Sequence, residues 1–401
     1  MRTADVFVIG GGAAGMAAAL AAGRRGAVTV LCEAFSLGGR LLTHIEGGVG
    51  KRAYGSEMTG PEYAGRAIAE LGNCPSVRIL RSAVVRVGSD LTVETAGGSG
   101  SFTYKVKAVV LACGGRDVSL YESGVPHPAG IAGIYSASDA LAAHCLYGRR
   151  IGRRAVVIGA GGDGLTVVRR LALEGTAIAG VIERRAIPGA GARMRQECLD
   201  DLHIPLYTSS EAISVRGGGR VSEVRALTSE GEVVLRCDAV VCAVGRRPDL
   251  SLLPFVSRDA ESGIAVVDSS MMTNVPGFFV IGGALHSCGT GDRATEEGRI
   301  AGAAAADYAL RGQFGSKAYW LRPTRELAYV LPARFTAGRD AEICLRTRSC
   351  IGRGSIVLRD LGGNVVRRTE PRAINAGMEV RVRLEADAVK SNLFVGAEEE
   401  G

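Results

Sequence analysis

Short, uninterrupted apolar runs recur along the first three quarters of the chain, and several of them end at glycines. Runs of this length without polar alternation are typical of strands buried on both faces of a parallel sheet. An alanine-rich segment of helical length joins the first two runs, so residues 5–33 predict a strand–helix–strand unit. The runs lie at residues 6–9, 28–32, 108–115, 237–245 and 275–281.

Glycines mark the turn between the first run and the helix. Gly10, Gly12 and Gly15 have G-x-G-x-x-G spacing, and Glu33 closes the second run 23 residues after Gly10. The first glycine permits a tight turn, the second lets the backbone approach a pyrophosphate, and the third lets the helix pack closely on the strand. An acid about 20 residues further on hydrogen-bonds a ribose 2′-hydroxyl. The stretch therefore predicts a dinucleotide-binding site.

Residues 155–183 repeat this pattern and predict a second dinucleotide site. The acid is Glu183, 24 residues after the first glycine of the repeat. Glu183 suits the free 2′-hydroxyl of NADH, whereas Arg184 and Arg185 could hold the 2′-phosphate of NADPH. The acid makes NADH the favoured cofactor. The glycines of the repeat are Gly159, Gly161 and Gly164.

The remaining pattern predicts further helices and strands. A helix is expected at 61–71, where Thr59 and Pro61 are start signals, and another at 138–146. A third helix is expected to open with Thr295 and two acids and to run to Arg311. Strands are expected at 77–87, 91–95 and 102–107, with a turn at 97–100. Beyond about residue 327, short alternating strands predict a small all-β domain with a frayed tail at 398–400. These last strands are 342–346, 355–358, 365–368 and 379–384.

Composition narrows the function classes. The 401 residues allow two or three domains, and the 47% apolar content is that of a globular chain. The net charge of +7 comes without a basic run interleaved with aromatic residues, so we expect no nucleic-acid partner. No run of 18 uncharged apolar residues occurs, so no membrane span is expected. Ten cysteines without a secretion signal favour a reducing, cytoplasmic setting.

The order of motifs resembles one superfamily over residues 4–315. The two fingerprints, AVVLACGG, CDAVVCAVGRRPD and TNVPGFFVIGG follow the order of flavoproteins with two dinucleotide-binding domains, of the thioredoxin- and glutathione-reductase type. SEMTGPEYAGR, GIYSASDAL and TEEGRIAG are similar to a subgroup without the redox disulfide. Its members include the FAD/NAD(P)H oxidoreductase associated with glycerol-3-phosphate dehydrogenase and, more distantly, subunits of opine oxidase and hydrogen cyanide synthase.

The resemblance implies a fold and a set of cofactor-binding residues. The fold is α/β, with an NAD(P) domain at 121–256 inserted into an FAD domain at 1–120 and 257–318, and an all-β domain at 325–401. FAD is expected at the first fingerprint and Glu33, and NAD(P)H at the second fingerprint and Glu183. Other backbone positions expected near the cofactors are Gly39, Arg40, Gly114, Gly245 and Gly282.

Two positions depart from the family pattern. The superfamily usually carries an Asp that bonds the flavin ribityl chain, and Gly283 stands in its place. Loss of this contact puts the strength of FAD binding in doubt. Thr43 stands where subgroup members tend to carry Cys, which weakens the case for thiol chemistry there.

Disulfide reduction needs two cysteines that can pair, and the sequence contains no C-x-x-C. Cys237 and Cys242 lie in one predicted strand, where five residues separate them by roughly 16 Å. Cys113 and Cys288 are expected to be buried small apolar residues near the cofactor rather than nucleophiles. We therefore expect no redox-active disulfide.

Three residues are candidates to act on the flavin. His44 and His286 lie in glycine-rich loops and could tune the flavin or contact substrate, or could simply be hydrogen-bonded loop histidines. Thr295 is expected at a helix N-terminus, whose free amides would stabilise negative charge on reduced flavin.

Three functions fit these features. The favoured one is an FAD-dependent NAD(P)H oxidoreductase that exchanges electrons with a partner dehydrogenase subunit, one acting on glycerol 3-phosphate being the candidate. The alternatives are a free-standing flavin oxidase or reductase with a small acceptor, and a non-enzymatic scaffold subunit with relic nucleotide sites. No metal site is predicted.

Overall fold

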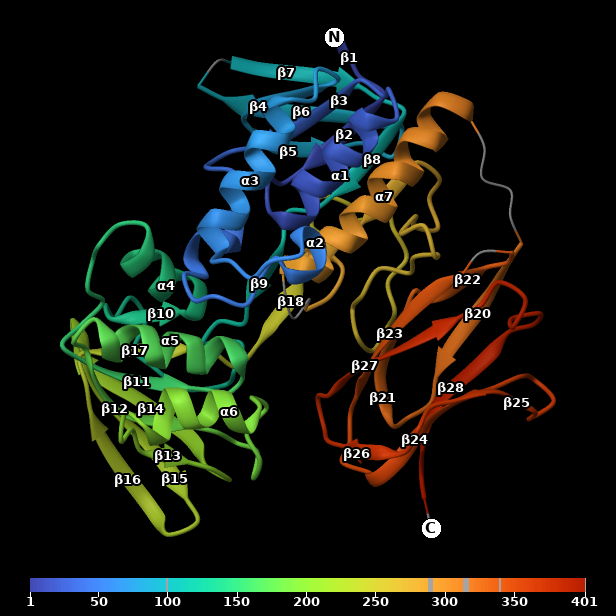
Figure 1. Cartoon of the computed structure of the whole chain (residues 1–401). Coiled ribbons are helices and arrows are strands. Elements are labelled where there is room, and N and C mark those ends of the chain that lie inside the picture. Colours follow the sequence, from blue (N-terminus) through green and yellow to red (C-terminus); the bar gives the residue numbers. More distant parts are fainter. Residues whose placement is uncertain (99, 288–290, 313–316, 339, 401) are drawn as a thin grey trace. The chain divides into compact units, whose positions relative to one another are not determined.

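A computed structural model describes residues 1–98, 100–287, 291–312, 317–338 and 340–400. The chain divides into one unit of Met1–Gly115 with Pro248–Gly401 and a second unit, Arg116–Arg247, inserted into it (Figure 1). The two segments at which the chain passes from one unit to the other pair with each other as short strands. They are β9 (Gly115–Asp117) and β18 (Arg246–Pro248). The insertion therefore begins and ends a few residues earlier than the predicted limits at 121 and 256.

The first unit is built on a five-stranded parallel sheet. Every residue of its three central strands except Glu33 is buried, as the unbroken apolar runs predict. The expected strand at 275–281 is shorter, because residues 273–278 form a turn in which the Phe278 carbonyl accepts from the Thr273 amide. The strands in spatial order are β19 (Phe278–Val280), β8 (Ala108–Leu111), β2 (Val6–Ile9), β3 (Thr29–Glu33) and β4 (Val77–Arg81).

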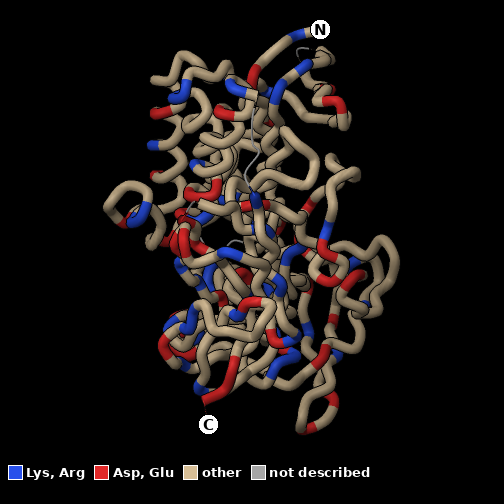
Figure 2. The backbone as a smooth tube through the Cα atoms, turned by 90° about the vertical axis from the view of Figure 1, so that its right-hand side faces the viewer, with Lys and Arg blue, Asp and Glu red and all other residues tan. Residues whose placement is uncertain are grey.

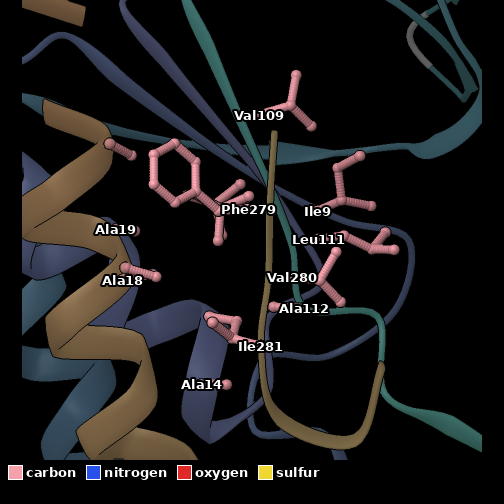
Figure 3. Close-up of a cluster of buried hydrophobic side chains, with 14 of the residues drawn as sticks. Ile9, Ala14, Ala18, Ala19, Val109, Leu111, Ala112, Phe279, Val280 and Ile281 are labelled. Carbon is pink, nitrogen blue, oxygen red and sulfur yellow. The ribbon is translucent and has the colours of Figure 1, made fainter. Parts of the chain in front are cut away.

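Two helices, α1 (Ala13–Arg24) and α7 (Gly291–Arg311), pack against each other beside this sheet. Their contact is made of small residues. A Cβ on Gly298 of α7 would lie 2.2 Å from the Ala14 carbonyl oxygen, and one on Gly302 would lie 2.1 Å from that of Ala18. In Figure 3 the side chain of Phe279 extends from its strand toward the helices, where Ala18 and Ala19 lie. The alanine-rich composition of α1 thus serves close helix packing.

The segment that follows β3 confirms one predicted helix and corrects one predicted strand. Helix α3 (Gly60–Gly72) begins with a capping box in which Thr59 and Glu62 bond each other's backbone amides. The run expected as a single strand at 77–87 is two strands, because Ser82 separates β4 from a strand of a different sheet. That sheet has the order β1 (Arg2–Thr3), β7 (Gly100–Lys105), β6 (Thr92–Gly97) and β5 (Ala83–Val87).

The inserted unit repeats the parallel-sheet design. It carries α4 (Ala137–Cys145), α5 (Gly162–Leu173), α6 (Ala192–Arg195) and a π-helical turn at Gln196–Asp200. Its parallel sheet has the order β10 (Ile134–Ser136), β17 (Ala239–Cys242), β11 (Arg154–Ile158), β12 (Ala177–Ile182) and β13 (Leu206–Tyr207). An antiparallel sheet adds β14 (Glu211–Gly218), β15 (Arg220–Thr228) and β16 (Gly231–Arg236). Two Rossmann-like sheets in one chain confirm the predicted fold class.

The C-terminal part is all-β, as predicted, and begins earlier, at Ala318. Two sheets enclose one apolar core that includes Phe335, Ile343, Ile356 and Val395. One has the order β22 (Arg334–Thr336), β20 (Ala318–Pro323), β28 (Leu393–Glu399), β24 (Gly352–Arg359) and β25 (Val365–Arg368), with β26 (Arg372–Ile374) also on β24. The other has the order β21 (Leu327–Leu331), β23 (Ala341–Thr347) and β27 (Glu379–Leu384).

The predicted fraying of the tail is wrong. Residues 393–399 form β28, which lies between β20 and β24, and the Glu398 carboxylate accepts hydrogen bonds from Arg359 and Arg368. Buried and exposed positions alternate in this strand, but Phe394 puts an apolar side chain at an exposed position, so the hydrophobic pattern of the sequence did not mark it as a strand.

The helix contact yields a stability prediction. Gly302→Ala should lower the free energy of unfolding by about 1–3 kcal/mol, because its Cβ overlaps the backbone of Ala18. The matched control is Gly65→Ala in α3, where a Cβ meets nothing within 4 Å. That change should raise stability by about 1 kcal/mol through helix propensity. Urea unfolding followed by circular dichroism measures both, and equal effects would show that the α1–α7 contact is not close-packed.

Candidate functional site

The first glycine turn leaves β2 and enters α1. Gly10 has a φ of 101°, and a Cβ there would lie 2.4 Å from the Ala112 carbonyl oxygen. A Cβ on Gly15 would lie 1.8 Å from the Gly10 carbonyl oxygen. At Gly12, by contrast, a Cβ would meet nothing within 4 Å. Gly10 and Gly15 thus allow close backbone packing, while Gly12 leaves open space at the N-terminus of α1.

Glu33, at the end of β3, reaches back to this turn. Its Oε2 accepts a hydrogen bond of 2.8 Å from the Gly11 amide, and its Oε1 accepts one of 3.0 Å from the Phe35 amide. These bonds hold the carboxylate beside the glycine turn, where a ribose attached to the pyrophosphate would lie.

The inserted unit has the same construction. A Cβ on Gly159 would lie 2.5 Å from the Ala243 carbonyl oxygen, one on Gly164 would lie 2.1 Å from that of Gly159, and Gly161 faces open space. Glu183 is only 4% exposed, and its Oε2 accepts a 2.8 Å hydrogen bond from the Ala160 amide. The predicted sequence repeat is therefore a repeat of geometry as well.

The two arginines after Glu183 are both engaged by carboxylates. Arg185 donates to Glu183 Oε1 from its amide at 3.0 Å and from Nε at 3.1 Å. Arg184 Nη2 donates to Glu211 Oε1 at 2.6 Å. Each guanidinium would have to leave a carboxylate partner in order to bind a 2′-phosphate.

The loop after Glu33 touches the first turn. Residues Gly39–Thr43 form a 3₁₀ turn, and a Cβ on Gly39 would lie 3.2 Å from the Gly12 Cα. The Gly38 amide donates to the Gly11 carbonyl oxygen at 2.8 Å. Arg40 lies on this turn and is exposed. The loop therefore borders the open space at Gly12.

The glycines that follow the later strands lie at the same ends of the sheets. Gly114 follows β8 with a φ of 84°, and Gly245 follows β17 with a φ of 130°; a Cβ at either would face open space. Because they belong to different units, they border different candidate sites.

Close packing explains the glycines at positions 282 and 283. Gly282 has a φ of 61°. A Cβ on Gly283 would lie 2.9 Å from the Gly115 amide nitrogen and 3.2 Å from the Gly114 Cα. An aspartate side chain at position 283 would therefore require the backbone after β8 to move.

Thr295 does not lie at a helix N-terminus, and this prediction is wrong. Helix α7 begins at Gly291, which places Thr295 in the second turn, where it is buried and bonded to the Tyr63 hydroxyl at 2.6 Å. Burial raises the pKa of Tyr63 to about 12, so the hydroxyl keeps its proton. The predicted start rested on the acids at 296 and 297, but the acid in the first turn is Asp292.

Asp292 is a buried acid that sequence reasoning missed. Its carboxylate accepts hydrogen bonds from the Gly50 amide at 3.0 Å and the Ala53 amide at 3.3 Å. It thereby ties the short helix α2 (Lys51–Tyr54) to the first turn of α7. The signal was weak, since one acid near a helix start usually serves its own helix.

The two candidate histidines have different surroundings. His44 is half-buried, and its main-chain carbonyl oxygen accepts a 2.7 Å hydrogen bond from the Gly60 amide. His286 is 1% exposed, and its Nε2 lies 2.7 Å from Glu297 Oε1. Its Nδ1 lies 3.3 Å from the Tyr329 hydroxyl. Glu297 and Tyr329 were not predicted as site residues, because they come from a helix and a strand distant in sequence.

The cysteines of the described residues, which do not include Cys288, form no disulfide with one another. Cys113 is exposed rather than buried, although desolvation of its sulfur and the neighbouring Asp249 raise the pKa of the thiol to about 12. Cys242 ends β17, and Cys237 precedes that strand rather than lying in it, because β17 begins only at Ala239. Burial raises the pKa of Cys237 to about 12. The thiols of Cys113 and Cys237 therefore lack the low pKa of a nucleophilic cysteine.

The described residues hold no cluster of three or more His, Cys, Asp or Glu side chains suited to a metal ion. None of the helices within the described ranges is long and apolar enough to cross a membrane. Lys and Arg positions (blue) and Asp and Glu positions (red) are intermixed along the backbone tube in Figure 2, and no long basic stretch is visible in that view of the described residues.

Two glycine turns, each beside a bonded glutamate in its own Rossmann-like unit, define a class of protein that binds two dinucleotides. Residues 4–306 match the family described as pyridine nucleotide-disulphide oxidoreductase. A thioredoxin reductase from Treponema pallidum (strain Nichols) is 30% identical over 311 residues, which cover 76% of this chain and 96% of the relative. A ferredoxin–NADP reductase from Streptococcus equi subsp. zooepidemicus is 25% identical and covers 75% of this chain and 88% of the relative.

The crystal structure of Lactococcus lactis thioredoxin reductase has the same fold. It aligns with a TM-score of 0.64 at 20% identity, covering 77% of this chain and 99% of that one. The chain belongs to the pyridine nucleotide-disulphide oxidoreductase family. Membership implies that it is an oxidoreductase that binds FAD and NAD(P)H.

The first turn fits FAD at the adenosine and pyrophosphate end. The open space at Gly12 would admit the pyrophosphate, and the Glu33 carboxylate held beside it would accept from the ribose. At the flavin end the fit differs from the superfamily pattern, because Gly283 offers no carboxylate and the backbone of Gly114 and Gly115 leaves no space for one.

This fit leads to a binding prediction. Glu33→Ala should weaken FAD binding at least about tenfold, because it removes the ribose contact and releases the Gly11 amide. Glu183→Ala, which makes the equivalent change in the inserted unit, should leave FAD affinity unchanged. FAD titration of cofactor-free protein, followed by flavin fluorescence, measures both, and full FAD retention by the Glu33 variant would contradict the assignment.

Proposed function

We propose that this protein is an FAD-dependent NAD(P)H oxidoreductase that transfers electrons between a nicotinamide cofactor, flavin and a partner dehydrogenase subunit. The observation that carries the proposal is the pair of glycine turns in separate units, each with a carboxylate bonded to the turn amide, Glu33 to Gly11 and Glu183 to Ala160. One turn suits FAD and the other suits a nicotinamide dinucleotide. When bound, FAD supplies the two-electron chemistry that amino-acid side chains lack.

The chain's own residues bind and orient. Amides at the N-termini of α1 and α5 face the positions of the two pyrophosphates, and the open spaces at Gly12 and Gly161 let the backbone approach them. Glu33 and Glu183 would bind the ribose hydroxyls of the two cofactors. His286 and the loop around it border the strand end at which the flavin would lie, and His44 lies in the loop after the first turn. Hydride transfer asks for orientation rather than for acid–base catalysis by the protein.

We infer that thiol–disulfide chemistry is not the reaction. Sequence matches include thioredoxin reductases, but this chain has no C-x-x-C. The raised pKa values of Cys113 and Cys237, both about 12, leave these thiols protonated at neutral pH. Electrons must then leave the flavin for another acceptor.

A partner subunit is the acceptor or donor that best suits the chain. The matched region ends at residue 306, and the thioredoxin reductases are covered almost in full without the C-terminal strands. An added domain of this kind suits assembly with another subunit. The sequence resemblance to oxidoreductases associated with glycerol-3-phosphate dehydrogenase makes a dehydrogenase of that substrate class the candidate partner.

The proposal is tested on the FAD-loaded protein under anaerobic conditions. NADH should bleach the visible flavin absorption within seconds, while the isolated chain should turn over slowly with oxygen or a small disulfide. Pull-down from the native cell should then recover a dehydrogenase subunit whose addition restores turnover. Flavin that neither NADH nor NADPH reduces would contradict the proposal, and rapid turnover by the isolated chain would point to a free-standing enzyme.

NADH is the proposed nicotinamide cofactor, because the Glu183 carboxylate is held beside the second glycine turn and both following arginines are held by carboxylates. The catalytic preference for NADH over NADPH should be at least about tenfold, and Glu183→Gln should narrow it by relieving repulsion of the 2′-phosphate. Glu174→Gln, an exposed change on the end of α5, is the control and should leave the preference unaltered. Stopped-flow flavin reduction with each cofactor gives the ratio. A preference for NADPH in the wild-type protein would reverse the assignment.

A further inference from the structure

One carboxylate organises the loop that follows β19. Glu297, in the second turn of α7, accepts a 2.8 Å hydrogen bond from the Gly282 amide through Oε2. Its Oε1 lies 2.7 Å from His286 Nε2. Glu297 thus contacts both ends of the loop at 282–286, next to the position where the superfamily carries its ribityl-binding Asp.

His286 carries this network on to the C-terminal domain. Because Nε2 faces a carboxylate, that nitrogen carries a proton, and in the tautomer with its proton on Nε2 the Nδ1 atom is an acceptor. The Tyr329 hydroxyl of β21 lies 3.3 Å from Nδ1 and can donate to it. The two rings also meet edge-on, with centroids 5.8 Å apart. His286 therefore joins the loop at 282–286 to the C-terminal domain.

Other contacts join the same elements. Tyr329 and Leu331 of β21 belong to the buried apolar cluster that contains Ile281 and Leu285. Arg346 of β23 donates to the Ser287 carbonyl oxygen at 3.1 Å. In the first turn of α7, Arg293 forms an ion pair with Glu379 of β27. Strands from one sheet of the C-terminal domain thus hold both the loop and the start of the helix.

These contacts coincide with two differences from the thioredoxin reductases. The family match stops at residue 306, so the strands that hold the loop lie outside the matched region. The loop itself has Gly283 in place of the usual Asp, and its backbone packs too closely on Gly114 and Gly115 for a side chain.

We propose that the C-terminal domain completes the flavin site, with Glu297 and Tyr329 acting through His286 as positioning residues for the loop at 282–286. The inference rests on the proposed function only in that the first unit binds FAD. In the superfamily, the Asp holds this loop by direct contact with the cofactor. Here, the hydrogen bonds of Glu297, His286 and Tyr329 would hold the loop from the side away from the cofactor. The C-terminal domain then has a role in cofactor binding besides any role in assembly.

The test compares FAD binding and flavin potential in single variants of the full chain. Glu297→Gln should weaken FAD binding about tenfold and Tyr329→Phe about threefold, the range expected for loss of a charged and of a neutral hydrogen bond. Glu297→Gln should also make the flavin reduction potential more positive, since a negative charge near reduced flavin is removed. A purely structural role would leave the potential of the bound flavin unchanged.

Two matched controls share the unit but not the network. Tyr104→Phe removes another buried hydroxyl, which accepts from Arg2, and Glu70→Gln removes a carboxylate paired with Arg24. Both should bind FAD within about twofold of wild type, less than the effect of a lost hydrogen bond.

The outcomes separate this inference from the proposed function. If FAD affinity and flavin potential are unchanged in both network variants, the inference is overturned. The same holds if the variants only lower the thermal stability of the FAD-free protein and leave affinity and potential unchanged. If Glu297→Gln fails to fold, Tyr329→Phe decides by affinity. Wild-type flavin that no nicotinamide reduces overturns the proposed function and leaves the affinity comparison intact. A wild-type protein that takes up no FAD overturns both.

Discussion

The close approach of α1 to its neighbours is the constraint on which the first unit depends. Gly15 lets the start of α1 rest against the Gly10 carbonyl, and Gly298 and Gly302 let α7 lie against the backbone of α1. Because both contacts are made by backbone atoms, neither can be relaxed by a side-chain rotation. The same contact that packs the helix points its free amides at the space beside Gly12. Gly15, Gly298 and Gly302 thus serve packing, whereas Gly12 leaves the space beside the helix N-terminus open.

Carboxylates bonded to backbone amides recur wherever a loop must hold its shape. Glu33 and Glu183 each bond the amide inside a glycine turn, Asp292 bonds the amides at the start of α2, and Glu297 bonds the Gly282 amide. A carboxylate accepts several hydrogen bonds at once and makes charge-assisted ones, so a single residue can organise an irregular segment. The glycine-rich loops around the candidate flavin site are held in this way by acids from more regular elements.

The parts that could be predicted from the sequence are those governed by local pattern. Apolar runs marked the central strands, and the spacing of Gly10 and Gly159 with their partners marked both turns, because these features depend on neighbours within one strand–helix–strand unit. The helix start at 295 was misplaced because two acids resemble first-turn residues, whereas one of them, Glu297, bonds a loop instead. The strand at 393–399 was missed because its pairing partners, β20 and β24, lie far away in the chain.

By itself the sequence determined that the chain contains two glycine turns, each followed at the spacing typical of ribose-binding acids by a glutamate, and an appended β segment. Local steric rules suffice for the turns, since Gly10 and Gly159 have a positive φ and, like Gly15 and Gly164, leave no space for a Cβ. Only the tertiary structure decided what Glu297, His286 and Tyr329 do, because their hydrogen bonds join a helix, a loop and a strand across the fold. It likewise supplied the reason for Gly283, which is the nearness of a backbone from another strand.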